Sequence, residues 1–156
     1  MPPKGEGDAQ PVRLESLAPQ QLAELRANLN NEIQRLADGG NALTRAATTC
    51  NNARKAVEQL AASKKGQSIM LPLTSSLYVS GAVDDVEKVL VDIGTGYYVE
   101  MPVADAAKFY ERRIKTLQDN ISNIQGTLRE RQNALMQVQA ILQEKMAMAQ
   151  ASGARS

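Results

Sequence analysis

Apolar residues recur every seven positions over two long stretches of this 156-residue sequence. In the first stretch the repeat has no gap: Leu22, Leu29, Leu36, Leu43, Cys50 and Val57. The second stretch is equally regular: Ala107, Ile114, Ile121, Leu128, Leu135, Leu142 and Ala149. Such a repeat is typical of helices that supercoil around a partner helix. We therefore expect two long coiled-coil helices.

A companion row, three residues on from the first, is weaker in both stretches. Glu32 interrupts it in the first stretch, and Arg131 and Lys145 interrupt it in the second. If the two helices run antiparallel, Glu32 and Arg131 lie at similar heights. We interpret them as a solvated pair that sets the register of the helices.

Prolines and glycines divide the chain into segments. Pro19 and Pro102 each precede a long pattern without further proline, which suits a residue favoured in the first turn of a helix. Gly66 follows the first pattern at a position typical of a helix C-cap. We expect one domain over residues 19–150 and five segments in all: a disordered leader 1–18, a helix 19–65, a β region 66–101, a helix 102–150 and a flexible tail 151–156.

The glycine pair Gly39–Gly40 leaves an alternative open for the first helix. Two glycines inside a helix cost about 2 kcal/mol relative to alanine, so a break there would give three shorter helices. The heptad keeps its phase from Leu36 to Leu43, and this favours one continuous helix. In an antiparallel register Gly126 falls near Gly40, which suggests a flexible joint at that height.

The β region predicts two hairpins. A β-branched run at 88–93, the turn Gly94-Thr95-Gly96 and an aromatic run at 97–101 form one hairpin signature, and runs at 69–73 and 77–79 form the other. Two hairpins leave strand edges unpaired, so we expect other chains to pair with them. The candidate interface residues are Val79, Val89, Val91, Ile93, Tyr97 and Val99. The fold class is mainly α with a small β part: an antiparallel two-helix coiled coil joined by two β-hairpins.

The composition argues against several functions. The sequence has no His and one Cys, so the commonest general base and metal ligand are missing. We expect no enzymatic activity, no cofactor and no metal. A net charge of +1 offers no basic patch for nucleic acid, and no apolar run suits a membrane. The polar start of the chain lacks the pattern of a secretory signal, so we expect the cytosol or the nucleus.

The two segments Leu71–Val79 and Val89–Glu100 resemble the α-class prefoldin subunits. The resemblance covers residues 19–150 and is most specific from Asp92 to Glu100. It implies a heterohexamer in which this chain joins one further α-class and four β-class subunits, with the β-hairpins forming a β-barrel platform. It also implies a co-chaperone that holds unfolded actin and tubulin at the tips of its coiled coils without ATP and delivers them to the cytosolic group II chaperonin. The implied location is cytoplasmic, with a nuclear one left open.

The open ends of the two helices carry the candidate client-binding residues. They are Leu22, Leu25, Leu29, Ile33, Met136, Leu142, Met146 and Met148. Methionine is flexible and polarisable, which suits a surface that accepts many sequences. For Leu22, Leu29 and Leu142, as for Leu135, we favour the alternative that they join the two helices, because they lie on the regular rows. A second alternative concerns function: a structural coiled-coil adaptor that tethers fixed protein partners.

Overall fold

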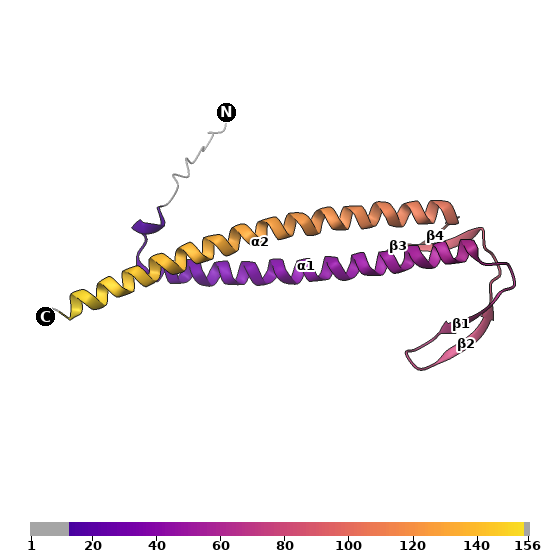
Figure 1. Ribbon diagram of the computed structural model, residues 1–156, viewed down its shortest axis with the longest axis horizontal. Coiled ribbons are helices and arrows are strands. Elements are labelled where there is room, and N and C mark those ends of the chain that lie inside the picture. The colour runs from indigo at the N-terminus through magenta and orange to yellow at the C-terminus, as the bar shows by residue number, and fades with distance from the viewer. Residues whose placement is uncertain (1–12, 155–156) are drawn as a thin grey trace, which may run out of the picture. The chain divides into compact units, whose positions relative to one another are not determined.

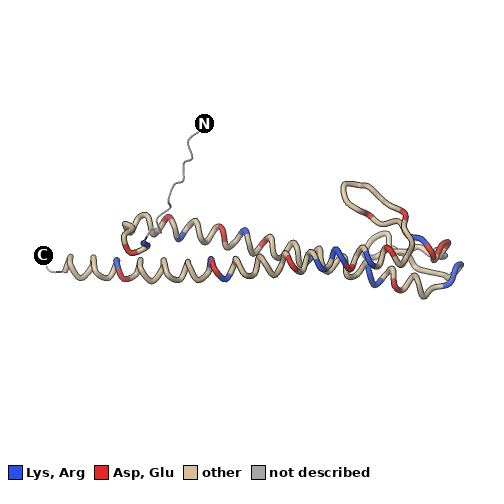
Figure 2. Tube along the Cα trace, turned by 90° about the horizontal axis from the view of Figure 1, so that it is seen from above, with Lys and Arg blue, Asp and Glu red and all other residues tan. Residues whose placement is uncertain are grey.

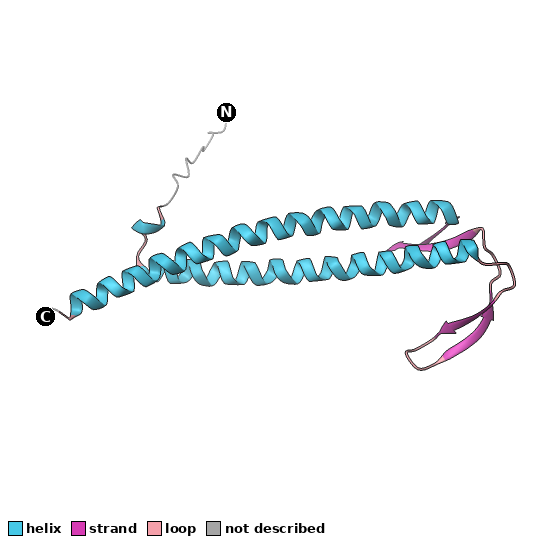
Figure 3. Ribbon diagram, in the orientation of Figure 1, coloured by secondary structure: helices cyan, strands magenta, loops and turns pink. Residues whose placement is uncertain are grey.

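The computed structural model describes residues 13–154 and consists of two long helices and two small β-hairpins (Figures 1 and 3). A short 3-10 helix comes first. The elements in chain order are η1 (Leu14–Ser16), α1 (Pro19–Ala62), β1 (Ser68–Pro72), β2 (Tyr78–Ala82), β3 (Lys88–Gly94), β4 (Tyr97–Pro102) and α2 (Val103–Gly153). The predicted fold class is confirmed, including the division of the β region into two antiparallel hairpins.

Helix α1 begins with a cap and ends where the chain turns toward the first hairpin. The amide of Ala18 donates to Gln21 Oε1 at 3.0 Å, and Pro19 fills the first helical position. At the other end Gly66 takes a φ of +80°, and its amide donates to the Val83 carbonyl at 2.7 Å. The helix therefore stops at Ala62, three residues before the predicted end.

Helix α1 runs unbroken through Gly39–Gly40, so the alternative of three shorter helices is wrong. A Cβ on Gly40 would lie 3.5 Å from Ile124 Cγ2, whereas one on Gly39 would meet nothing within 4 Å. Gly40 thus faces α2, and Gly39 points away from it. The hypothesis of a flexible joint at this height stays a prediction.

The chain divides into two compact units, residues 1–40 with 123–156 and residues 41–122. In the first unit a cluster of four buried residues joins the helices: Leu22, Leu29, Val138 and Leu142. The partner of Glu32 on α2 is Arg131, and the neighbour of Gly40 is Ile124. Since the α2 position falls as the α1 position rises, the two helices run antiparallel here.

The second unit has its own core where β3 and β4 pack on the helices. Its buried residues are Val57, Val91 and Ala106. In the β3–β4 hairpin Val91 pairs with Val99, and a bulge falls between Asp92 and Gly94. The turn that follows has positive φ at all three residues, Gly94, Thr95 and Gly96. Glycine at two of these positions avoids most of the strain that such a turn imposes on L residues.

The β1–β2 hairpin pairs Ser68 with Ala82 at one end and Pro72 with Tyr78 at the other. In the loop between the strands, Thr74 Oγ1 accepts the amide of Leu77 at 3.1 Å. A Cβ on Gly81 would come 3.1 Å from Leu71 Cδ1, so a larger residue there would require the Leu71 side chain to shift by a few tenths of an ångström.

The ends of the chain differ from the sequence prediction where the structure describes them. The leader was expected to be disordered over residues 1–18; residues 1–12 lie outside the described part, but residues 13–18 contain η1 and contact the first core. The physical reason is that Leu14 and Leu17 find apolar partners. Helix α2 continues to Gly153, three residues beyond its expected end.

Candidate functional site

Large apolar side chains lie exposed on both hairpins of the second unit. We call this set the hairpin surface: Met70, Leu71, Leu73, Leu77, Tyr78, Val79, Leu90, Ile93, Tyr97, Tyr98 and Val99. The most exposed are Leu90 at 70% and Tyr97 at 69%. Many large apolar side chains exposed together are typical of an interaction site, because the exposure of apolar surface to water is unfavourable.

The structure divides the predicted interface residues into three groups. Val79, Ile93, Tyr97 and Val99 are exposed and belong to the hairpin surface. Val89 is half-buried against the chain's own core. Val91 is only 1% exposed, between Val57 and Ala106, so it has no surface left for a partner and is removed from the candidate interface.

The sequence reasoning missed several members of the hairpin surface. Leu90 stands between Val89 and Val91 on β3, so strand alternation places it on the opposite face. Across the pair Asp92 lies opposite Tyr98, which is 63% exposed on that same outer face. Alternation predicts that the candidate residues divide between this chain's own core and its neighbours, but the sequence alone does not say which face packs inward, and Leu90 and Tyr98 were left out.

Strand edges add a second kind of recognition at the hairpins. In residues 13–154 each sheet contains two strands, so the outer edge of each strand has no strand beside it. Free edges of this sort invite another chain to add a strand through main-chain hydrogen bonds. The second unit therefore offers apolar side chains and open backbone together.

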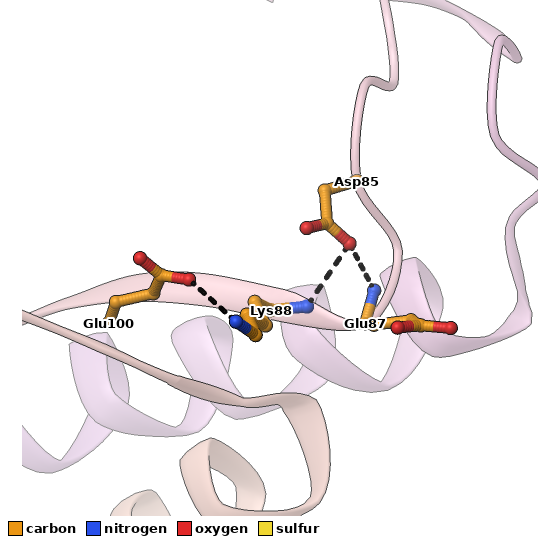
Figure 4. Close-up of polar contacts among 4 residues, drawn as sticks. All are labelled: Asp85, Glu87, Lys88 and Glu100. Atoms are coloured by element: carbon orange, nitrogen blue, oxygen red, sulfur yellow. Dashed lines mark hydrogen bonds and ion pairs between the residues drawn. The ribbon is translucent and has the colours of Figure 1, made fainter.

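A carboxylate fixes the start of the second hairpin (Figure 4). Asp85 Oδ1 accepts the amide of Glu87 at 2.7 Å and the amide of Lys88 at 3.3 Å. The bond from Glu87 is the main cause that lowers the pKa of the Asp85 carboxyl. Lys88 Nζ in turn lies 3.3 Å from Glu100 Oε1 across the β3–β4 pair.

The predicted client-binding residues at the end of the helix pair also fall into groups. Leu22, Leu29 and Leu142 are buried together in the first core. Leu25 and Ile33 are half-buried. The three methionines are exposed on α2: Met136 at 60%, Met146 at 54% and Met148 at 62%.

The last two turns of α2 expose two of these methionines, Met146 and Met148. Residues 146–153 carry no charged side chain, and α2 is also uncharged over residues 132–143, so Glu144 and Lys145 are the only charged residues from 132 to 153 (Figure 2). Since Leu142 packs with Leu22 near the start of α1, the end of α2 reaches past the first residue of α1. We call Met136, Met146 and Met148 together the methionine surface; Met146 and Met148 are two residues apart and so project from different faces of α2.

Lys145 is the functional candidate that the sequence reasoning overlooked at this end. Its Nζ atom donates to the carbonyls of Glu15 and Leu17, at 2.7 and 2.6 Å. The only sequence signal was its position as a charge that interrupts an apolar row. Its partners come from the segment that was expected to be disordered, so the pairing was not foreseeable.

No group of three or more Cys, Asp or Glu side chains is placed to hold a metal ion within residues 13–154. None of the described helices combines the length and apolar character that crossing a bilayer requires. Burial, reinforced by Cys50 and Asp92, raises the pKa of the Tyr110 phenol, so this group stays neutral near pH 7.

Comparison with known proteins gives one consistent result. A family model described as prefoldin subunit matches residues 21–147. Prefoldin subunit 5 of Homo sapiens is 35% identical over 146 residues, which cover 94% of this chain and 95% of the human protein. Probable prefoldin subunit 5 of Schizosaccharomyces pombe is 35% identical over 136 residues, which cover 86% of this chain and 88% of that protein.

A solved structure supports the same fold. The cryo-EM structure of filamentous PFD from Methanocaldococcus jannaschii matches with a TM-score of 0.66 and covers 75% of this chain and 97% of that one. Its sequence identity is 20%, so it speaks for the fold alone. The human and fission-yeast proteins support the family assignment by their sequence identity, and both match over most of their own length and of this chain. With two long helices, two hairpins and this agreement over most of its length, the chain belongs to the prefoldin subunit family.

Proposed function

We propose that this chain is a subunit of a hetero-oligomeric co-chaperone that holds unfolded polypeptides without using ATP. The observation that carries the proposal is that the chain exposes two sets of large apolar side chains: the hairpin surface in one unit and the methionine surface in the other. One surface suits permanent assembly, and the other suits transient contact with many sequences.

The hairpin surface supports the assembly part of the proposal. Interfaces that form the core of stable complexes are rich in aromatic and large aliphatic side chains, and Tyr78, Tyr97 and Tyr98 all lie exposed here. Two-stranded sheets are marginal alone and gain stability when further strands join them. In the proposed complex the hairpins of this chain and its neighbours complete a shared β-barrel platform in a hexamer.

Family membership supports a finer proposal for the partners. We propose one further α-class subunit and four β-class subunits as neighbours, unfolded actin and tubulin as clients, and the group II chaperonin as the acceptor. The site of action is the cytoplasm, with the nucleus as a second location. No nucleic acid, membrane, metal or cofactor takes part, and the chain is not an enzyme.

The methionine surface supports the holding part. Flexible thioether side chains adapt to clients of different shape, and each contact contributes about 25 cal/mol per Å² of apolar area buried. Contacts that are weak singly add up when several arms grip one client.

The test is suppression of aggregation by the reconstituted complex, with and without nucleotide. A chemically unfolded client is diluted into buffer while light scattering is recorded. The triple variant with Met136, Met146 and Met148 changed to Ser is compared with a control in which the exposed Gln139, Gln143 and Gln150 become Ser. We expect suppression that needs no nucleotide, persists in the control and weakens in the methionine variant. An intact complex that suppresses nothing would remove the chaperone proposal.

A coiled-coil adaptor is the second candidate function. The burial of Leu22, Leu29 and Leu142 favours it, because these residues serve the helix pair rather than a client. An adaptor binds one folded partner at a defined site, so the complex would then retain a single folded protein and ignore unfolded ones.

A further inference from the structure

A short segment before α1 covers the end of the helix pair. We call residues 13–18 the cover segment. Its Leu14 and Leu17 pack against the buried cluster of the first unit. Leu22 in that cluster is 0% exposed, although a coil of two helices has no third layer of its own. The two leucines supply the missing apolar cover.

Lys145 binds the cover segment through its main chain. The Lys145 ammonium donates to the carbonyls of Glu15 and Leu17, which lie two residues apart. An ammonium has three donors and no preference for the side chain beside the carbonyl it meets. This form of recognition is therefore independent of the sequence of the bound segment.

The start of α1 accounts for only part of this arrangement. Leu17 precedes the capping residue Ala18 and is placed to pack against Leu22, as in a hydrophobic staple. Neither Leu14 nor Lys145 belongs to that motif. Their contacts go beyond what is needed to begin the helix. The contact between Lys145 and Glu15 joins residues that are 130 positions apart in the sequence.

The cover segment does not pack along its full length. An open cleft of about 560 Å³ lies between it and α2, with Leu14 and Glu15 on one side and Gln137, Ala140 and Ile141 on the other. Leu14 is half-buried. Two leucines and one cation hold the segment, and the remaining surface beside it is free to receive other groups.

The surface beneath the cover segment continues beyond it. On α2, Ile141, Lys145 and Met148 are spaced four and three residues apart and so lie along one stripe of the helix. Ile141 packs against the buried cluster and lines the cleft beside the cover segment, whereas Met148 is 62% exposed. A segment longer than the resident one would extend onto Met148.

We propose that this end of the helix pair is a binding site for a short polypeptide segment with two large apolar residues three positions apart. The cover segment is its resident occupant, and a segment of the same chemistry in an unfolded client displaces it. Lys145 binds the main-chain carbonyls of whichever segment is present. The inference rests on the proposed holding function and specifies which feature of the client is read.

A client can bind only while the resident segment is away from the site. The apparent affinity for clients is therefore the intrinsic affinity multiplied by the fraction of molecules in which the site is open. Changing Leu14 to Ser weakens the resident and leaves the staple of Leu17 intact. In the assembled complex, this variant should bind labelled, reduced and carboxymethylated lactalbumin about five- to tenfold more tightly. The control Gln20→Ser alters an exposed side chain just after the segment, outside the lining of the cleft, and should change nothing.

The role of Lys145 is tested in the Leu14→Ser background, where the resident segment competes less. Lys145→Met keeps the stem, removes the ammonium and should reverse most of the gain, while Lys145→Arg should retain it. A synthetic peptide of residues 13–18 should compete with lactalbumin, and the same peptide with both leucines changed to Ser should not. An unchanged or weaker affinity in the Leu14→Ser complex would overturn the inference.

Hydrogen exchange provides a second readout on the unmodified complex. The amides of Ser16 and Leu17 donate within the cover segment to Arg13 and Leu14. Saturating lactalbumin should speed their exchange, because displacement releases the 3-10 turn; equal or slower exchange would contradict displacement. If the unmodified complex fails to suppress aggregation, the proposed function itself fails. If it suppresses aggregation but Leu14→Ser alters no affinity, only this inference fails.

Discussion

Arg131 Nε lies 2.9 Å from Glu32 Oε1 across the two helices of the first unit. Each residue interrupts a mainly apolar companion row, and their side chains are equally exposed, at 45%. A half-exposed pair of this kind contributes little to stability, but it distinguishes one alignment of the helices from those shifted by a turn. The sequence interpretation of these two residues as a register-setting pair agrees with this geometry.

Reversing one charge of this pair should destabilise the helix pair, and reversing both should restore it. Glu32→Lys places an ammonium beside the Arg131 guanidinium, and we expect the free energy of unfolding to fall by about 1 kcal/mol. The double variant Glu32→Lys with Arg131→Glu should recover most of this loss. Urea unfolding of the full chain, followed by far-UV circular dichroism at low and high salt, measures both. Equal stability of the single and double variants would contradict a direct interaction.

Alanine at the glycine pair of α1 should stabilise the chain. Both residues are helical, and the added methyl group has room, with nothing within 4 Å of Gly39 and an ordinary contact between Gly40 and Ile124. We expect each change to raise the free energy of unfolding by about 1 kcal/mol. Gly66→Ala is the matched control and should destabilise, because Gly66 has a φ of +80°.

The same variants test the flexible joint. Hydrogen exchange of the amides around residues 39–40 and 126 should be faster than in neighbouring turns of the original chain, and Gly39→Ala should slow it. Uniform protection along α1 would show that the glycines leave the helix as stable there as elsewhere.

The sequence was sufficient to predict the long helices and the hairpins because each depends on a local pattern. The seven-residue repeat around Leu22 and Leu142 specifies which helix faces meet, and Gly94-Thr95-Gly96 specifies a turn. These signals act over a few residues or a regular period, so no tertiary information is needed to recognise them.

The order in residues 13–18 was not predictable in the same way. It depends on contacts between Leu14, Leu17 and Lys145, residues far apart in the sequence. Val91 was assigned to an interface for a related reason. Whether an apolar strand residue faces its own helices or a partner depends on how the hairpin docks, and in the structure it docks with Val91 inward.

Truncation of two adjacent residues of β3 should affect the stability of the chain differently. Val91 is 1% exposed, and Val91→Ala should lower the free energy of unfolding of the full chain by about 2 kcal/mol, from lost apolar burial. Leu90 is 70% exposed, so Leu90→Ala should leave that stability nearly unchanged. Urea unfolding of the two variants provides the comparison.

Incorporation into the hetero-oligomer should depend on Leu90, although the stability of the single chain does not. Leu90→Ser removes part of the hairpin surface and should reduce the fraction of chain recovered in the hetero-oligomer, as measured by size-exclusion chromatography with light scattering. Thr95→Ser lies in the turn of the same hairpin and serves as the control. Full incorporation of the Leu90→Ser chain would exclude this face of β3 from the interface.

The start of β3 should loosen at low pH because of Asp85. The amides of Glu87 and Lys88 donate to its carboxylate, so the pKa of Asp85 in the folded chain lies below its usual value of 3.8. A lowered folded pKa means that the charged form stabilises the fold at pH values above 3.8 and that this contribution disappears as the pH falls through the folded pKa. Exchange of the two amides, corrected for their intrinsic rates, should therefore accelerate as the pH falls through the folded pKa of Asp85.

Two variants serve as controls. Asp85→Asn retains an acceptor oxygen without the titrating charge, so its amides should show no acid step. In Asp85→Ala the same two amides should exchange quickly at every pH. If the Asn variant shows the same acid step as the unmodified chain, another carboxylate controls the start of this hairpin.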